Sequence, residues 1–260
     1  MRALVFSAGG AFGAYQAGAW RALEEQGFQP DILAGASVGA LNATLVARGC
    51  TGAQLQELWR DSRSDVFAWN WPPRNLGILD SRRLLRRIAE LLERFPARCP
   101  ARNLRVSLTE IPSTAIRVAA DEEVTAERLL ASCAIPLVYS PVRLEQRWYV
   151  DGGFFCRLPI RAAVEAGADE IVAVDVLAVP PSRLARGALR AAIGLRRFLT
   201  GEPDGMAAPA GVQLEVIASR DALGGQRDLL RWDRRNTERW LAAGYGDAKA
   251  ASALPTPAAR

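Results

Sequence analysis

The stretch ILAGASVGALNATLVAR at residues 32–48 decides the fold of this 260-residue chain. Its apolar beginning, residues 32–34, predicts a strand, and its end predicts a helix that runs to about Arg48. Between them lies the sequence GASVG, residues 35–39, which is typical of a tight turn from a strand into a helix. The stretch therefore predicts one complete strand–turn–helix unit.

A second unit of this kind comes earlier in the chain. The apolar residues 3–6 are followed by Ser7-Ala8-Gly9-Gly10 and then by a helical pattern that ends near Gly27. Further apolar runs predict strands at 104–108, 115–119, 148–150, 170–176 and 212–217, with helical segments between most of them. Repeated units of strand, turn and helix predict an α/β protein with a parallel sheet and helices packed on it.

The pattern breaks in two places. Over residues 61–80 the chain is rich in aromatic residues and proline, among them Trp69, Trp71 and Pro72, which predicts a loop or lid. Residues 251–260 turn to Pro, Ala and Thr and are expected to form a flexible C-terminal tail.

The composition restricts the chemistry that this chain can perform. It has no histidine, and Lys249 is the single lysine among 33 basic residues. A Ser-His-Asp triad, a histidine-bound zinc site and a Walker phosphate loop are therefore excluded or strongly disfavoured. If the protein is an acid–base enzyme, its carboxylates must move the protons.

The remaining composition is that of an ordinary globular protein with a net charge of +5. Its longest uncharged stretches, 3–20 and 32–47, are built from Gly, Ala and Ser and do not resemble membrane spans or a secretion signal. The four cysteines lie far apart without C-x-x-C spacing, which predicts reduced thiols in a cytoplasmic protein. No metal site and no cofactor are expected.

Ser37 is the candidate nucleophile. The G-x-S-x-G spacing removes side chains on both sides, at Gly35 and Gly39, so that a sharp turn can expose the serine hydroxyl. The helix that starts at Val38 directs its amide groups and its positive dipole end toward that hydroxyl, which favours an oxyanion there. The alternative interpretation of these small residues is a simple packing contact between sheet and helix.

Asp151 is the acid that best fits the role of a base. It ends the strand-like run RWYV at residues 147–150, and Gly152 and Gly153 follow it. Two glycines allow a sharp turn at the end of the strand and admit a neighbouring hydroxyl close to the carboxylate. The alternative is a turn aspartate that binds its own backbone.

The first glycine turn, Gly9-Gly10-Ala11 with Gly13 beyond it, supplies candidate donors for an oxyanion. Consecutive glycines at the start of a helix present bare amide groups to a developing negative charge. A dinucleotide loop is the competing interpretation, but G-x-G-x-x-G would need glycine in place of Ala8, and no acidic residue ends the second strand.

Three blocks of this sequence together resemble those of the patatin-like phospholipase family: SAGGAFGA at 7–14, GASVGALN at 35–42 and DGG at 151–153. The stretch ASCAIP at 131–136 also resembles the segment that precedes the aspartate strand in that family. The resemblance implies a three-layer patatin-like fold, with a mainly parallel central sheet and helices on both faces, and one domain over residues 1–250.

The resemblance also implies a serine–aspartate dyad lipid acyl hydrolase of the phospholipase A, lysophospholipase or carboxylesterase type. Ser37 would be the nucleophile, Asp151 its base, and the amides of Gly9, Gly10 and Ala11 the oxyanion hole. The sequence departs from the family at Ala8, where glycine is usual, and at Phe12, where a basic residue is common.

Partners are predicted from the distribution of arginine. Over residues 82–95 the leucines and Ile88 share one helical face, while Arg82, Arg83, Arg86, Arg87 and Arg94 lie off it, and residues 183–199 repeat the theme. Such a helix either packs on the core with a solvated basic face or docks peripherally on an anionic membrane.

Two other classes of function compete with the hydrolase. A nucleic-acid binder is disfavoured because 28 acidic residues are interspersed with the basic ones and no known binding module appears. The second alternative is a catalytically silent patatin-fold protein that binds lipid or a partner. Lipid or a small ester is the expected substrate.

Overall fold

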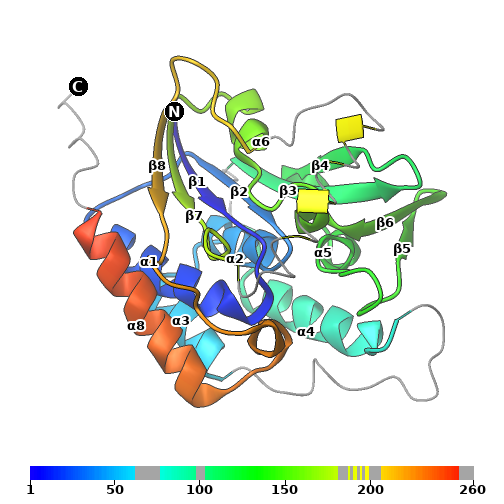
Figure 1. The fold of residues 1–260 in the computed structure, drawn as a ribbon, viewed down its shortest axis with the longest axis horizontal. Helices are drawn as coiled ribbons and strands as arrows, with labels where there is room; N and C mark the ends of the chain where they lie inside the picture. The colour runs from blue at the N-terminus through cyan, green and yellow to red at the C-terminus, as the bar shows by residue number, and fades with distance from the viewer. Residues whose placement is uncertain are drawn as a thin grey trace.

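The computed structural model describes residues 1–61, 77–97, 103–180 and 206–251, with isolated positions between 181 and 205. Its described strands form one eight-stranded sheet in the order β5-β6-β3-β2-β1-β7-β8, with β4 paired to β3 (Figure 1). The pairs β3–β2, β2–β1, β1–β7 and β7–β8 are parallel, and the three others are antiparallel. The strands are β1 Arg2–Phe6, β2 Ile32–Ala36, β3 Asn103–Ile111, β4 Ile116–Ala120, β5 Val142–Leu144, β6 Arg147–Asp151, β7 Glu170–Val174 and β8 Gln213–Ile217.

Helices cover both faces of this sheet, which confirms the predicted three-layer α/β arrangement. The helices are α1 Gly13–Glu25, α2 Val38–Ala47, α3 Gly52–Arg60, α4 Ser81–Arg94, α5 Ala126–Ser132, α6 Ile160–Glu165 and α8 Arg234–Ala250. Short 3-10 turns are Gly10–Phe12, Asp121–Glu123, Gly152–Phe154 and Gln226–Leu230.

The central strands bury alternate side chains in two separate cores. In β1, Leu4 and Phe6 join the large core beneath α1, α2 and α8, whereas Ala3 and Val5 join the smaller core against α6. Both sets are fully buried, and this explains why the strand reads as a continuous apolar run rather than an alternating one.

The predicted strands are all present, with ends that differ by one to three residues. The predicted strand 170–176 ends at Val174, because both neighbouring strands end opposite this residue, β1 at Phe6 and β8 at Ile217. The sequence pattern missed β5, which has three residues and is too short to show a period. Of the predicted lid, residues 62–76 lie outside the described residues, as do 252–260 of the tail and most of 183–199.

The helix α8 closes the large core by packing on α1. Gly18 and Gly244 let the two backbones meet, because a Cβ on Gly18 would overlap the carbonyl oxygen of Leu241 and one on Gly244 would overlap that of Tyr15. The Tyr15 hydroxyl donates a 2.7 Å hydrogen bond to Asp247 across this contact. The C-terminal helix thereby supports the helix that follows the first glycine turn.

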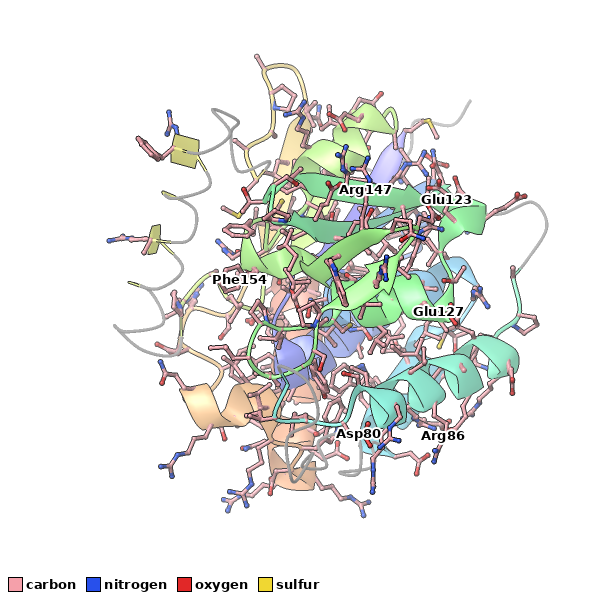
Figure 2. The ribbon with its side chains drawn as sticks, turned by 90° about the vertical axis from the view of Figure 1, so that its right-hand side faces the viewer. Asp80, Arg86, Glu123, Glu127, Arg147 and Phe154 are labelled. Atoms are coloured by element: carbon pink, nitrogen blue, oxygen red, sulfur yellow. The ribbon has the colours of Figure 1, made fainter. Side chains whose placement is uncertain are left out.

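The helix α4 lies at the surface with its two faces sharply divided. Ile88 and Leu91 are buried, while Arg82, Arg83 and Arg86 are exposed, and Figure 2 shows Arg86 pointing outward from the helix. The apolar face of α4 thus packs on the core, and its basic face lies at the surface. None of the helices in the described ranges has both the length and the apolarity needed to cross a membrane.

Candidate active site

Ser37 occupies the turn between β2 and α2. Its backbone has φ 56° and ψ −130°, a combination that costs a residue with a side chain about 1–3 kcal/mol. The flanking glycines permit the turn through close approach, since a Cβ on Gly35 would overlap the carbonyl oxygen of Gly39, and one on Gly39 would overlap that of Phe6. The hydroxyl is thereby placed between the carboxyl end of a strand and the amino end of a helix.

Asp151 reaches Ser37 through the register of β3. Ser107 of β3 pairs with Ala36, the residue before Ser37, and the next residue, Leu108, pairs with Asp151. Since β4 pairs with Ser107 and Leu108 on the other edge, β6 must follow β2 along the same edge of β3. The end of β6 therefore meets the end of β2, although 114 residues separate the two side chains along the chain.

The two side chains form a short hydrogen bond. Ser37 Oγ donates to Asp151 Oδ2 at 2.6 Å, and the backbone N–H of Gly153 donates to Asp151 Oδ1 at 2.7 Å. Asp151 is only 4% exposed. Burial raises the pKa of this carboxyl to about 7, although both hydrogen bonds lower it. A carboxyl with this pKa exchanges its proton near neutral pH.

Gly152 and Gly153 are needed for space. A Cβ on Gly152 would overlap the carbonyl oxygen of Ser107, and one on Gly153 would overlap the methyl group of Ala8. The alanine in place of the family's usual glycine thus packs against Gly153, and this contact brings the first glycine turn next to the Asp151 turn.

The first glycine turn lies beside the serine. Gly10, with φ 53°, lines the same cavity as Ser37; Gly9 precedes it, and the chain continues through Ala11 to Gly13, the first residue of α1. Amide groups at the start of a helical turn have no partner within that turn and point outward from its end. This geometry suits the stabilisation of an oxyanion next to Ser37.

Several hydrogen bonds fix the position of this turn. The backbone N–H of Ser7 donates to Val174 at 3.1 Å, and that of Ala8 donates to the Arg157 carbonyl at 2.7 Å. Arg157 is itself held by an ion pair with the buried Asp175. Phe12, at the position where the family often has a basic residue, is 1% exposed and packs edge-to-face on Trp240 at 5.0 Å. It points into the core and does not line the cavity.

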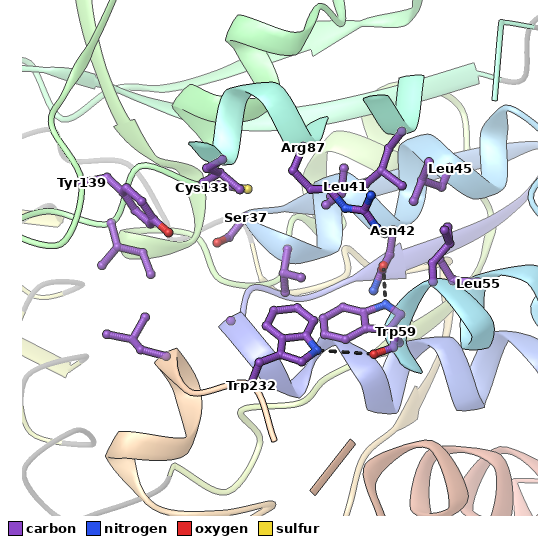
Figure 3. A pocket seen from close by; sticks show the side chains of 17 residues that line it. Ser37, Leu41, Asn42, Leu45, Leu55, Trp59, Arg87, Cys133, Tyr139 and Trp232 are labelled. Carbon is purple, nitrogen blue, oxygen red and sulfur yellow. Dashed lines mark hydrogen bonds between the residues drawn. The ribbon is translucent and has the colours of Figure 1, made fainter. Parts of the chain in front are cut away.

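An apolar cavity of about 120 Å³ opens beside Ser37 (Figure 3). Its wall is formed mainly by leucines and aromatic rings from α2, α3 and α4, with contributions from the segments near Ile135 and Trp232. Trp59 and Trp232 stack with ring centroids 4.6 Å apart, and the Trp59 indole donates a 3.1 Å hydrogen bond to Asn42. The cavity therefore has an apolar wall that includes a stacked pair of tryptophan rings, of which Trp59 is held in place by a hydrogen bond.

Arg87 and Cys133 are the unexpected members of this wall. Of the described residues that line the cavity, Arg87 alone is charged; it is 21% exposed, and Figure 3 shows its guanidinium at the cavity. The Cys133 thiol lies against Ser37, and burial raises its pKa, so it stays protonated at neutral pH. The sequence gives no signal for either role, because each depends on how α4 and α5 pack on α2.

The other cysteines and acids form no metal cluster within the described ranges. Cys50 and Cys156 are buried free thiols, Cys133 is a partly exposed one, and Cys99 lies outside the described residues. No cluster of three or more His, Cys, Asp and Glu side chains in the described part of the chain could hold a metal ion.

Comparisons with known proteins add a family and a fold. The family model described as patatin-like phospholipase matches residues 4–164. The uncharacterised protein YqhO of Bacillus subtilis (strain 168) is 26% identical over 187 residues, which cover 60% of this chain and 64% of YqhO. The chain therefore spans less than two thirds of the length of this relative.

Among solved structures, VipD from Legionella pneumophila has a TM-score of 0.51 at 15% sequence identity, over 96% of this chain and 66% of VipD. The type III effector ExoU of Pseudomonas aeruginosa has a TM-score of 0.49 at 14% identity, over 96% of this chain and 52% of ExoU. The likeness to VipD shows a shared fold.

Proposed function

This chain belongs to the patatin-like phospholipase family, whose model covers more than half of it, and from this premise we propose that it hydrolyses acyl esters of lipids. The observation that carries the proposal is the 2.6 Å hydrogen bond from Ser37 to the buried carboxyl of Asp151 beside an apolar cavity. We take residues 1–250 as one catalytic domain, because α8 packs along α1 behind the glycine turn.

In the proposed first step, Ser37 Oγ attacks the carbonyl carbon of the ester while its proton passes to Asp151 Oδ2. The carbonyl oxygen becomes negative and receives hydrogen bonds from the backbone amides of Gly9, Gly10 and Ala11. The bond to the alcohol then breaks, Asp151 gives the proton to the departing alkoxide, and the acyl group remains on Ser37.

In the second step, a water molecule attacks the acyl carbon and gives a proton to Asp151. The Ser37 oxygen leaves and takes that proton back, so the free acid and the original dyad are restored. A pKa of about 7 suits both steps, because a group that titrates near the working pH can accept and return the proton with little loss. No histidine is required at any point.

The cavity supports an acyl chain as the group bound next to Ser37. Leu41 and Leu45 of α2 and Leu55 of α3 present only apolar atoms to it, and an aliphatic chain gains free energy when it leaves water for such a wall. Arg87 supports a substrate that also carries an anionic group, since a guanidinium binds phosphate through two charge-assisted hydrogen bonds. Its present partners, Glu90 at 3.3 Å and Asp61 at 4.0 Å, are about half exposed or more.

These observations favour phospholipids or lysophospholipids over simple carboxylic esters as substrates. The outward arginines of α4 extend the proposal to a peripheral contact with an anionic membrane. Arg82 is engaged by Asp80 at 3.0 Å, which leaves Arg83 and Arg86 as the residues expected to face the lipid.

Labelling with a fluorophosphonate probe tests the proposed nucleophile, together with hydrolysis of a soluble p-nitrophenyl ester. The wild-type protein is expected to be labelled and active, and Ser37→Ala to lose both properties. A suitable control is Thr44→Val, which removes a buried hydroxyl from the same helix without touching Ser37. An unlabelled, inactive wild-type protein that still binds lipid would instead support the catalytically silent alternative.

A further inference from the structure

Ser132, the last residue of α5, holds the backbone of the nucleophile. Its hydroxyl accepts a 3.0 Å hydrogen bond from the backbone N–H of Ser37 and donates a 2.8 Å hydrogen bond to the carbonyl of Ser107. Ser37 and Ser132 are both buried. The residue belongs to the stretch ASCAIP at 131–136, for which the sequence offers no chemical role.

The nucleophile turn needs such support because its conformation is strained. A residue with a side chain at φ 56° and ψ −130° returns to a relaxed conformation unless its neighbours hold it. On the carbonyl side, the oxygen of Ser37 accepts hydrogen bonds from Ala40 at 2.9 Å and Leu41 at 3.3 Å, which are the first bonds of α2. On the amide side, Ser132 provides the bond, so the two peptide groups that flank the Ser37 Cα are both held.

The same segment also holds the partner of the nucleophile. The backbone N–H of Asp151 donates a 2.9 Å hydrogen bond to the carbonyl of Ala134, two residues after Ser132. The acceptor of the Ser132 hydroxyl, Ser107, lies where β3 passes from pairing with β2 to pairing with β6. The end of α5 therefore contacts both residues of the dyad and the strand that aligns them.

We propose that Ser132 is a positioning residue, whose hydroxyl keeps the strained turn at Ser37 within hydrogen-bond distance of Asp151. The inference rests on the proposed function, because it concerns the same dyad. It assigns to Ser132 no contact with substrate; the residue acts through Ser37.

Removal of the hydroxyl has a specific consequence. In Ser132→Ala, the N–H of Ser37 and the carbonyl of Ser107 lose a buried partner, and the turn relaxes away from Asp151. The hydrogen bond from Ser37 lowers the pKa of Asp151, so its weakening raises that pKa above about 7. Loss of a purely structural contact would lower the amount of folded protein without moving this titration.

The test compares Ser132→Ala with Ser132→Thr, which keeps the hydroxyl, and with the control Thr44→Val. For a soluble ester, we expect Ser132→Ala to lower kcat about 10- to 100-fold with KM unchanged, and to move the midpoint of the kcat–pH profile upward. Ser132→Thr should restore both values, and Thr44→Val should change neither. Ser132→Cys, with a weaker hydrogen-bonding group of similar size, should be intermediate, and it replaces the alanine variant if that variant does not fold.

The pH dependence of the unfolding free energy reports the titration of the Asp151 carboxyl and does not require the protein to hydrolyse a substrate. If the midpoint of this pH dependence moves upward in Ser132→Ala, the positioning role of Ser132 is supported. This holds even if the wild-type protein hydrolyses none of the esters tried, because the absence of hydrolysis contradicts only the proposed function. An unchanged midpoint with kcat within about twofold of wild type overturns the inference, and so does a lower kcat with an unchanged midpoint.

Discussion

The sharpest prediction concerns the replacement of Asp151 by asparagine. The folded protein holds this carboxyl with a pKa of about 7, whereas the unfolded chain has a pKa near 3.9. Between these values the folded state binds the proton more tightly, so the free energy of unfolding falls as the pH rises toward 7. The Asp151→Asn variant would have no such titration, because the asparagine amide is neutral throughout.

The magnitude follows from the difference in pKa. Each unit is worth about 1.4 kcal/mol, so about three units correspond to about 4 kcal/mol in total. Of this total, about 3 kcal/mol falls between pH 5 and pH 8, because about two pH units of that interval lie below the pKa of the folded state. Relative to wild type, Asp151→Asn should therefore gain about 3 kcal/mol of stability between pH 5 and pH 8, and it should lack the proposed esterase activity.

The assay is urea unfolding followed by tryptophan fluorescence, at pH 5, 6, 7 and 8, for wild type, Asp151→Asn and Ser37→Ala. In Ser37→Ala the carboxyl loses a hydrogen bond that lowers its pKa, so its stability should keep falling to a higher pH than that of wild type. In parallel, kcat/KM of wild type should rise with pH and level off above about 7. A stability difference between wild type and Asp151→Asn that does not change with pH would refute the reasoning.

Three further predictions test the cavity wall, the surface and the core. Arg87→Gln should lower kcat/KM for a lysophospholipid about 10- to 100-fold and leave a neutral monoacylglycerol of equal chain length unaffected, whereas Arg161→Gln, on the exposed side of α6, should change neither; equal losses on both substrates would contradict a phosphate contact. In vesicle flotation, the wild-type protein should bind anionic vesicles, and added salt should weaken this binding. A double Arg83→Gln, Arg86→Gln variant should bind these vesicles less. Binding that does not depend on the charge of the lipid would contradict a role of the two arginines in membrane contact. Phe12→Ala should cost about 3–5 kcal/mol of unfolding free energy, because the buried ring packs on Trp240, and a cost below about 1 kcal/mol in urea unfolding would argue against this packing.

The local elements could be predicted because they depend on neighbouring residues. The apolar runs of β1 and β2 and the glycine-flanked turn at Ser37 are complete within short stretches, so their pattern identifies them. The same is true of the two faces of α4. In contrast, β5 has only three residues and exists because it pairs with β6, and no local pattern can show that.

The candidate site could be predicted only in part. The sequence excluded histidine and singled out Ser37, Asp151 and the first glycine turn as chemically suited groups. It did not identify Arg87 or Ser132, whose roles come from the packing of α4 and α5 against α2. The role of Phe12 in place of a basic residue could not be predicted, because it depends on the packing of its ring against Trp240 of α8.

By itself, the sequence limited the chemistry available to this protein: it has a serine in a predicted strand-to-helix turn and no histidine, so that a base for this serine would have to be a carboxylate. The tertiary structure decided whether the Ser37 hydroxyl and the Asp151 carboxyl meet, and at which pH the carboxyl takes up a proton. The register of β3 brings Ser37 within 2.6 Å of Asp151, and burial brings the pKa of that carboxyl to about 7. Distance and desolvation depend on residues far apart along the chain, so the folded packing alone fixes them.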